Sequence, residues 1–487
     1  LSGIFDTTPP DVIINATSFA VSSPDPGDWR DERAATVLDA PGVPVLQAVL
    51  AAHSHQAWAD GTTGLTARDI AMNVALPEVD GRLLARAVSF KDEDYRDEAC
   101  ECAIATHRAQ PDRVEFVADM AARWARLKNK PAAERKVAII LANYPNKDGR
   151  LANGVGLDTP QGTITVLSAL KAAGYLVDSE PETSDELMQS ILAGPTNWLT
   201  DRAQRDGGER LSLQAYQARY SVLPQDVRNR IETRWGKPQD DPFCGEGGFA
   251  LAIHRFGHLV IGVQPARGYN IDPEETYHSP DLVPPHNYLA FYFWLHGQTF
   301  DADAMVHMGK HGNLEWLPGK ATALSDTCLP EAVLGPVPNL YPFIVNDPGE
   351  GTQAKRRAQA VIIDHLTPPL TRAETYGPLR DLEALVDEYY EAAGVDPRRI
   401  GHLRDEILSL TQVTGLDVDA GMADADDADA RLQKLDTYLC ELKESQIRDG
   451  LHVFGAAPEG RLETDLVIAL TRIERGDGTA GDASLIR

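Results

Sequence analysis

Apolar runs of strand length alternate along this chain with stretches in which apolar residues recur at helical spacing. Asp11–Val21, Pro44–Ala51 and Lys136–Pro145 are runs of the first kind, and each is followed by turn-forming residues. Phe116–Lys130 and Thr163–Tyr175 have the periodicity that is typical of an amphipathic helix. The first third of the chain is therefore predicted to contain strands that lead into helices.

The same pattern continues through the middle of the chain, with two helical stretches before the strand-like runs resume. The predicted elements are helices at Ser184–Leu192, Leu211–Trp235 and Asn287–Phe300, strands within Gly245–Asn270 and at Ala302–Gly309, and a strand, turn, helix and apolar run within Pro338–Leu370. Beyond Gly377 the pattern is helical as far as Leu451.

Strands that alternate with helices favour a largely parallel sheet. We therefore expect a multidomain α/β protein made of Rossmann-like, largely parallel α/β units with an added helical region. The expected parts are an N-terminal α/β domain over 1–130, a central α/β region with a helical insertion and the functional site over 131–376, and a mainly helical segment over 377–487. Ligands of such sheets bind beyond the carboxyl ends of the strands, where Met305–Lys320 and Asn346–Gly351 are both expected to lie.

A loop rich in glycine and asparagine, Asn146–Gln161, follows the predicted strand Lys136–Pro145. The next helix has Asp158 or Thr159 as its expected cap, and Pro160 suits its first turn. The loop has neither the G-x-G-x-x-G nor the G-x-x-x-x-G-K-[ST] pattern. Its glycines fit an anion-binding loop and a loop that only needs positive φ angles equally well.

The segment MVHMGKHGNLEWLPGK, Met305–Lys320, places His307, His311 and Glu315 four residues apart. This spacing suggests a zinc-hydrolase helix, but the H-E-x-x-H pattern is missing, and glycines and a proline interrupt any helix. A strand that runs into a close-fitting glycine loop is the better interpretation. The path of the loop then decides whether the three side chains form a metal site or are separate hydrogen-bonded residues.

Further imidazoles and cations gather near the predicted turns. His278 and His286 lie on either side of a Pro-Pro pair that precedes a predicted helix, so they mark either a cleft edge or a plain helix boundary. Cations next to turns suit an anionic ligand, and arginine binds carboxylates with two hydrogen bonds. The candidates are Arg267 and Tyr269 in QPARGYN, and Lys310, Lys320, Lys355, Arg356, Arg357 and Arg372.

Composition narrows the classes of function. The 487 residues carry a formal net charge of −27, which argues against nucleic-acid binding because that needs a basic surface. No run of about 18 apolar residues predicts a membrane span. Five cysteines without a C-x-x-C pattern favour free thiols in a reducing, cytoplasmic compartment. A start at Leu1, without an initiator Met or a visible signal peptide, suggests a piece of a longer polypeptide.

At HMGKHGNLEWLPGKATALSD, His307–Asp326, the sequence resembles the large subunit of aerobic cobaltochelatase, the CobN family, and its relative, the large subunit of magnesium chelatase. The resemblance covers nearly the whole chain, and the forms ANYPNKDGRLANG and FIVNDPG are closer to the cobalt branch. It extends in order through Ala71–Arg82, Leu141–Pro160, Gly262–Leu295, Asn339–Glu374 and Leu439–Gly455.

The resemblance implies insertion of Co²⁺ into hydrogenobyrinic acid a,c-diamide, with ATP and Mg²⁺ used by a separate AAA+ motor subunit and its partner subunit. Co²⁺ accepts imidazole and carboxylate ligands, and ring protons need a base. We therefore expect Glu315 and His311 to be catalytic. The expected metal ligands are His307, His311, His286 and Glu315, and the expected substrate-binding residues are Arg267, Tyr269, Lys310, Trp316, Lys320, Lys355 and Arg356.

Three alternatives remain at this point. A magnesium-chelatase subunit would insert Mg²⁺ into protoporphyrin IX, and a porphyrin titration against a corrin titration distinguishes it. A tetrapyrrole carrier or sensor would share the binding site but need no motor. A metal-dependent hydrolase would hold a tight resident metal, whereas a chelatase must release its ion.

Overall fold

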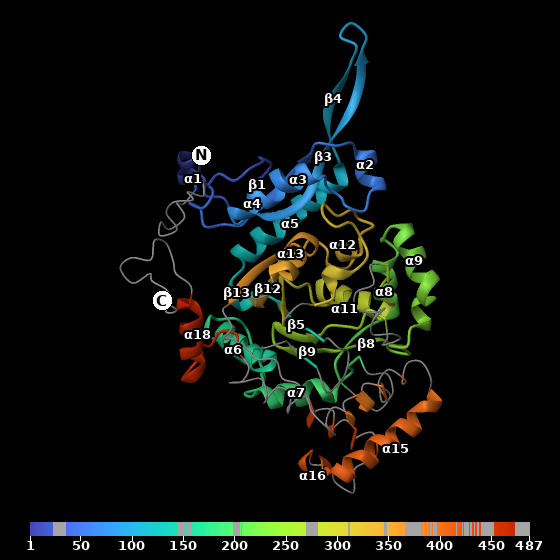
Figure 1. The fold of residues 1–487 in the computed structure, drawn as a ribbon. Helices are drawn as coiled ribbons and strands as arrows, with labels where there is room; N and C mark the ends of the chain where they lie inside the picture. Colours follow the sequence, from blue (N-terminus) through green and yellow to red (C-terminus); the bar gives the residue numbers. More distant parts are fainter. Residues whose placement is uncertain are drawn as a thin grey trace.

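The structure is a computed structural model in which two sheets dominate the described part of the chain (Figure 1). The described residues are 1–22, 36–143, 151–152, 157–197, 205, 207–268, 281–309, 312–344, 348–365, 397–414, 416–420 and 452–472, with scattered positions between 381 and 439.

The first sheet has four strands in the order β1-β2-β3-β4, of which the first three run parallel and the last is antiparallel. The outer halves of β3 and β4 form a hairpin that projects from the rest of the molecule (Figure 1). The sequence pattern did not predict this hairpin. The elements are α1 (Ser2–Thr7), β1 (Ile13–Asn15), β2 (Val45–Ala51), α2 (His55–Asp60), α3 (Ala67–Ile70), α4 (Leu76–Val79), β3 (Leu83–Asp97), β4 (Cys102–Ala109) and α5 (Pro111–Asn129).

The second sheet has six strands in the order β13-β12-β11-β5-β10-β9, all parallel except the edge strand β9. Its strands are β5 (Val137–Leu141), β9 (Ile253–Phe256), β10 (Leu259–Val263), β11 (Ala304–Met308), β12 (Asn339–Ile344) and β13 (Ala360–His365). Chain order across the parallel strands is 2-1-3-4-5, so the direction of winding reverses at β5. The parallel α/β prediction is confirmed, whereas the Rossmann-like detail is not.

Helices cover both faces of this sheet. On one face α6 (Thr159–Ala172) and α7 (Ser184–Ala193) pack on the odd-numbered residues of β5. Asp158, one of the two caps that the sequence allowed, caps α6 by accepting a hydrogen bond from the Gln161 N–H at 2.9 Å. On the other face lie α8 (Leu213–Tyr220), α9 (Gln225–Trp235), α11 (His286–His296) and α12 (Leu329–Leu334).

The remaining described elements surround this centre. α13 (Pro348–Arg357) joins β12 to β13, and a small sheet combines β6 (Glu209–Leu211), β7 (Cys244–Gly245) and β8 (Gly248–Leu251). The later helices are α15 (Pro397–Thr414), α16 (Leu416–Asp419) and α18 (Arg461–Thr471). Among the described helices, none has both the length and the apolar composition needed to cross a bilayer.

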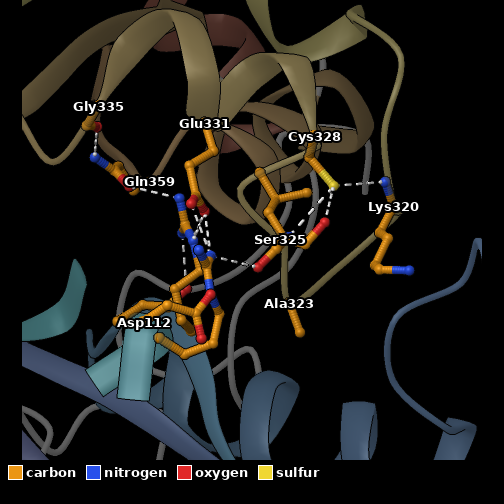
Figure 2. Close-up of polar contacts among 12 residues, drawn as sticks. Asp112, Lys320, Ala323, Ser325, Cys328, Glu331, Gly335 and Gln359 are labelled. Carbon is orange, nitrogen blue, oxygen red and sulfur yellow. Dashed lines mark hydrogen bonds and ion pairs between the residues drawn. The ribbon is translucent and has the colours of Figure 1, made fainter. Parts of the chain in front are cut away.

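A buried ionic cluster joins the two sheets. Glu331 reaches from α12 toward the first sheet (Figure 2). It contacts Arg86 of β3 and Arg113 of α5. The Arg86 Nε donates to Glu331 Oε2 at 2.5 Å, and the Arg113 Nη1 donates to Oε1 at 2.7 Å. Gln359 accepts a further hydrogen bond from Arg86 at 3.2 Å. Because a lone buried charge is costly, this cluster fixes α12 against the first sheet.

Candidate functional site

The candidate site lies at the carboxyl ends of β5 and β11, where the winding of the sheet reverses. The Ala142 N–H donates to the Met308 carbonyl at 3.0 Å, so the two strand ends stay together. Gly309 follows with a φ of 130°, and a Cβ there would lie 2.8 Å from the Ala142 Cβ. Only glycine fits this approach, which confirms a strand running into a close-fitting loop. Lys310 and His311 lie outside the described residues.

His307 is buried on β11 and has protein partners on both ring nitrogens. Its Nδ1 lies 2.8 Å from the Asn339 Oδ1, and its Nε2 lies 3.1 Å from the Tyr292 hydroxyl. These partners assign a proton to Nδ1, with Tyr292 donating to Nε2. Burial lowers the pKa of His307 to about 4, against which the Asn339 hydrogen bond acts. In this structure His307 is a neutral residue without a nitrogen available to a metal.

A chain of buried hydrogen bonds continues from His307 into the loop after β11. The Gln264 Nε2 donates to the Tyr292 hydroxyl at 2.8 Å, and the Gln264 Oε1 accepts from the Asn313 N–H at 2.9 Å. The Tyr288 hydroxyl donates to the Asn313 Oδ1 at 2.6 Å. These residues come from β11, α11 and the segment after β10. They fix Asn313, two residues before Glu315, against α11 and the segment after β10.

Glu315 lies in a short 3₁₀ turn, Leu314–Trp316, and its side chain is completely buried, with 0% exposure. The Tyr341 hydroxyl donates to the Glu315 Oε1 at 3.1 Å, and the Tyr341 ring stacks on His307 with 5.5 Å between ring centroids. Burial, and then the charge of Glu315, raise the pKa of Tyr341 well above its ordinary value, so its phenol keeps its proton. Tyr341 therefore connects His307 and Glu315, which the sequence predicted to belong together.

Two buried arginines lie close to this carboxylate. Arg357 donates to the backbone carbonyls of Glu315 at 2.5 Å, Leu317 at 2.7 Å and Lys320 at 3.1 Å, which fixes the turn. Arg267 is 1% exposed, and burial lowers its pKa to about 10, while Glu315 acts to raise it. Arg267 therefore remains a cation at neutral pH beside the carboxylate.

The two cations chosen from α13 by sequence lie elsewhere. Arg356 forms two hydrogen bonds with Glu78 of α4, at 3.2 and 3.0 Å, and the Lys355 Nζ lies 3.6 Å from the same carboxylate. Neither is brought to Glu315. Their neighbour Arg357 is the residue of this helix that reaches the site, which corrects the choice of Lys355 and Arg356.

Lys320 and His286 have structural contacts in place of the predicted ligand contacts. The Lys320 Nζ donates to the carbonyls of Trp58 at 2.7 Å, Ala59 at 3.0 Å and Gly61 at 2.5 Å, which uses all three of its protons. His286 has Tyr216 at 2.7 Å on Nδ1 and the Gly236 carbonyl at 3.0 Å on Nε2. Neither side chain is available to a substrate or a metal in this structure.

The other predicted residues give a mixed outcome. Trp316 lies in the turn with Glu315 and is partly exposed, so the predicted contact with a macrocycle face remains a prediction. Tyr269 lies outside the described residues, as does His278. Among the described residues, no group of three or more His, Cys, Asp and Glu side chains has the geometry of a metal site.

Asn143 is a site residue that the sequence interpretation did not choose. It follows β5 directly, its side chain is 2% exposed, and neither its Oδ1 nor its Nδ2 has a hydrogen-bond partner among the described residues. An unsatisfied buried amide at a strand end is a group that a ligand can satisfy. The signal was present, because Asn143 lies in the segment ANYPNKDGRLANG.

These features define an α/β protein whose candidate site lies where the winding of the parallel sheet reverses. The site contains the buried Glu315 carboxylate, Arg267 and Arg357, and the Asn143 amide, which has no hydrogen-bond partner among the described residues. A family model described as CobN/Magnesium Chelatase matches residues 2–487. The chain belongs to this family.

Relatives in the cobalt branch are the more similar ones. An aerobic cobaltochelatase subunit CobN from Sinorhizobium is 59% identical over 487 residues, which is 100% of this chain and 38% of the relative. The subunit of the same name from Pseudomonas aeruginosa is 52% identical over 98% of this chain and 38% of its own length. A magnesium-chelatase subunit from Chlorobaculum parvum is 30% identical over 97% of this chain and 36% of its own length.

A solved structure has the same fold. The catalytic subunit of cobaltochelatase from Mycobacterium tuberculosis superposes with a TM-score of 0.71 at 37% sequence identity. The superposition covers 97% of this chain and 40% of that chain. The chain therefore spans about two fifths of the length of the proteins it matches.

Proposed function

We propose that this chain forms the metallation region of a cobaltochelatase catalytic subunit, which inserts Co²⁺ into hydrogenobyrinic acid a,c-diamide. ATP is hydrolysed, with Mg²⁺, by a separate AAA+ motor subunit and its partner subunit. The observation that carries the proposal is the buried carboxylate of Glu315 at the reversal point of the sheet, in a chain 59% identical to a cobaltochelatase subunit over its whole length.

The chemistry of insertion suits this carboxylate. Co²⁺ must lose water, and the ring nitrogens must lose protons as they take up the metal. An ionised Glu315 attracts the cation strongly because it is shielded from water, and it can accept a ring proton. The Tyr341 phenol donates to the Glu315 Oε1 at 3.1 Å, and its ring stacks on His307, so it fixes these two residues relative to one another.

The substrate itself is an acidic macrocycle, so its carboxylates need cations. Of the two arginines near Glu315, Arg357 is bound to backbone carbonyls, and Arg267 has a pKa that stays at about 10. We assign it to a substrate carboxylate, together with Asn143 as a hydrogen-bonding partner. Lys310, Tyr269 and the catalytic role of His311 remain predictions from the sequence.

The full-length protein with its motor subunits tests the proposal through the absorption change of the corrin on metallation. We expect Glu315→Gln to lower the rate about 100-fold or more, because a positioned base contributes about that factor. Glu463→Gln on the exposed surface of α18 is the matched control and should keep the wild-type rate. A wild-type rate in Glu315→Gln would remove the carboxylate from the mechanism.

The cobalt and magnesium branches are separated by ligand titration of the same protein. The proposal expects tight binding of the corrin precursor and at least tenfold weaker binding of protoporphyrin IX. The identities of 59% and 52% to cobaltochelatase subunits, against 30% to a magnesium-chelatase subunit, support this order. The reverse order of affinity would move the chain to the magnesium branch.

A further inference from the structure

Two histidines outside the Glu315 site stack on one another where β13, an edge strand of the second sheet, ends. His365 is the last residue of β13, and His452 forms an isolated parallel bridge with Leu157, just before α6. Their ring centroids are 4.9 Å apart, and the ring planes differ by 21°. Segments almost 90 residues apart in the sequence are thus joined by an imidazole pair.

The nitrogens of this pair are unsatisfied. Within the described residues, the Nδ1 and Nε2 of His365 and the Nε2 of His452 are buried and have no hydrogen-bond partner. His452 is 6% exposed. Burying an unpaired polar group costs about 1–3 kcal/mol, so three such atoms at one place require an explanation.

The pair is also in the right state to bind a cation. Burial, followed by the neighbouring His452, lowers the pKa of His365 to about 4, and burial lowers the pKa of His452. Both rings are therefore neutral at pH 7, and a neutral imidazole offers a lone pair to a metal. His307 and His286 differ in this respect, because their nitrogens are occupied by protein partners.

We propose that His365 and His452 form a binding site for a divalent transition-metal ion of the Co²⁺ class, separate from the Glu315 site. Small movements of the two rings bring one nitrogen of each to a shared ion, and water completes its coordination. Imidazole suits borderline metals such as Co²⁺, whereas Mg²⁺ prefers oxygen ligands. A site with two protein ligands holds its metal more weakly than a structural site with four.

The position of the pair relative to Glu315 gives it a role. Tyr341 pairs with Ile362 across β12 and β13, and Ile344 pairs with His365, so Tyr341 and His365 lie on opposite faces of the sheet. Phe454, which packs edge-on against His365 at 4.9 Å, also lines an open groove of about 420 Å³ on that face. The pair thus lies behind Phe454 at this groove, and we infer that metal reaches it from the groove before transfer at the carboxyl edge. This role rests on the proposed function, whereas metal binding by the pair does not.

Titration of the untagged full chain with CoCl₂ tests the site, by calorimetry and by the ligand-field absorption of Co²⁺. We expect His365→Ala and His452→Ala each to weaken Co²⁺ binding at least tenfold. His402→Ala, which removes an exposed imidazole on α15, is the matched control and should bind as wild type does. Unchanged Co²⁺ affinity in both variants of the pair would overturn the proposal.

A second variant covers the case in which alanine at either position prevents folding. His452→Cys replaces one ligand by a thiolate, so Co²⁺ should produce a sulfur-to-cobalt charge-transfer band that the wild-type chain lacks. A folded His452→Cys chain without that band would also overturn the proposal. The variants of the pair are tested for Co²⁺ binding without corrin or motor, whereas Glu315→Gln is tested for metallation of the corrin, so failure of the metallation mechanism and failure of this site appear in different measurements.

Discussion

Two groups of polar side chains lie around the second sheet, and they differ in how completely the fold satisfies them. His307, Arg357 and Glu331 have protein partners for their polar atoms, at distances of 2.5–3.1 Å. Asn143 and His452 are also buried, and His365 is half-buried, but all three have buried atoms without partners in the described structure. The first group holds the fold together, and the second contains the groups that we propose to bind ligands.

This difference shows that sequence spacing and residue type do not distinguish metal or substrate ligands from residues that only stabilise the fold. His307 and His286 look like metal ligands in the sequence, yet hydrogen bonds within the protein occupy both nitrogens of each ring. Substitutions in the satisfied group should therefore cost stability. Substitutions in the unsatisfied group should cost binding and leave stability nearly unchanged.

The largest stability effect is expected for Glu331→Ala. The change leaves Arg86 and Arg113 buried without their shared carboxylate, and breaking such a cluster costs about 3–5 kcal/mol. Urea unfolding followed by circular dichroism measures it. Asp94→Ala, which breaks an exposed pair with Arg108 on the hairpin, is the control and should cost less than about 1 kcal/mol. Equal losses of unfolding free energy in the two variants would contradict the larger contribution expected of the buried cluster.

Acid should reveal the buried neutral state of His307. Its pKa is about 4 in the folded chain and about 6.5 when unfolded, so only the unfolded state gains a proton between these values. Its contribution is therefore full above pH 6.5 and is lost as the pH falls toward 4, by about 3 kcal/mol in total.

The measurement is the pH dependence of urea unfolding in the wild type and in His307→Gln. Other buried histidines also make the free energy of unfolding depend on pH. The difference between the pH dependence of the wild type and that of the variant therefore reports His307. We expect the variant to lose less stability between pH 6.5 and 4. Identical slopes would show that His307 is not held neutral.

Alanine substitutions of the two neighbouring arginines on α13 should differ in how much stability they cost. Arg357→Ala leaves three buried carbonyls without their charged donor and should cost about 2 kcal/mol or more. Arg356→Ala removes a partly exposed pair with Glu78 and should cost about 0.5 kcal/mol. Thermal unfolding of both variants measures the difference, and the reverse order would refute the assignment of Arg357 as the residue that fixes the Glu315 turn.

The smallest stability effect is expected for Asn143→Ala, within about 0.5 kcal/mol, because the lost amide has no described partner to leave behind. Corrin binding by the same variant should weaken about tenfold. Asn197→Ala is the matched contrast, because its amide bonds the Gln264 carbonyl at 2.9 Å and the Ala266 N–H at 3.1 Å. A large loss of stability with unchanged corrin binding would place Asn143 in the satisfied group.

The sequence predicted the central fold well, because apolar runs such as Val137–Leu141 and the cap at Asp158 are local signals. The β3–β4 hairpin was missed because its outer half is polar and exposed, so it lacks the alternation that a half-buried strand shows. The location of the site at the end of β11 also followed from the glycines after Met308.

The partners of each site residue did not follow from the sequence. Arg356 and Arg357 are adjacent, and only the orientation of α13 between α4 and the Glu315 turn decides which one reaches Glu315. Lys320 similarly meets Trp58, Ala59 and Gly61, which lie more than 250 positions earlier. Long-range contacts of this kind depend on the packing of whole elements, and no local pattern encodes them.

The most direct test of the account separates binding from metallation in Glu315→Gln. Corrin binding is measured by tryptophan fluorescence, and single-turnover metallation is followed with the motor subunits and ATP present. The account predicts a corrin Kd within about threefold of the wild type and metallation about 100-fold slower, because the carboxylate acts in the chemical step. Metallation at the wild-type rate, or a slower rate explained entirely by lost corrin binding, would contradict it.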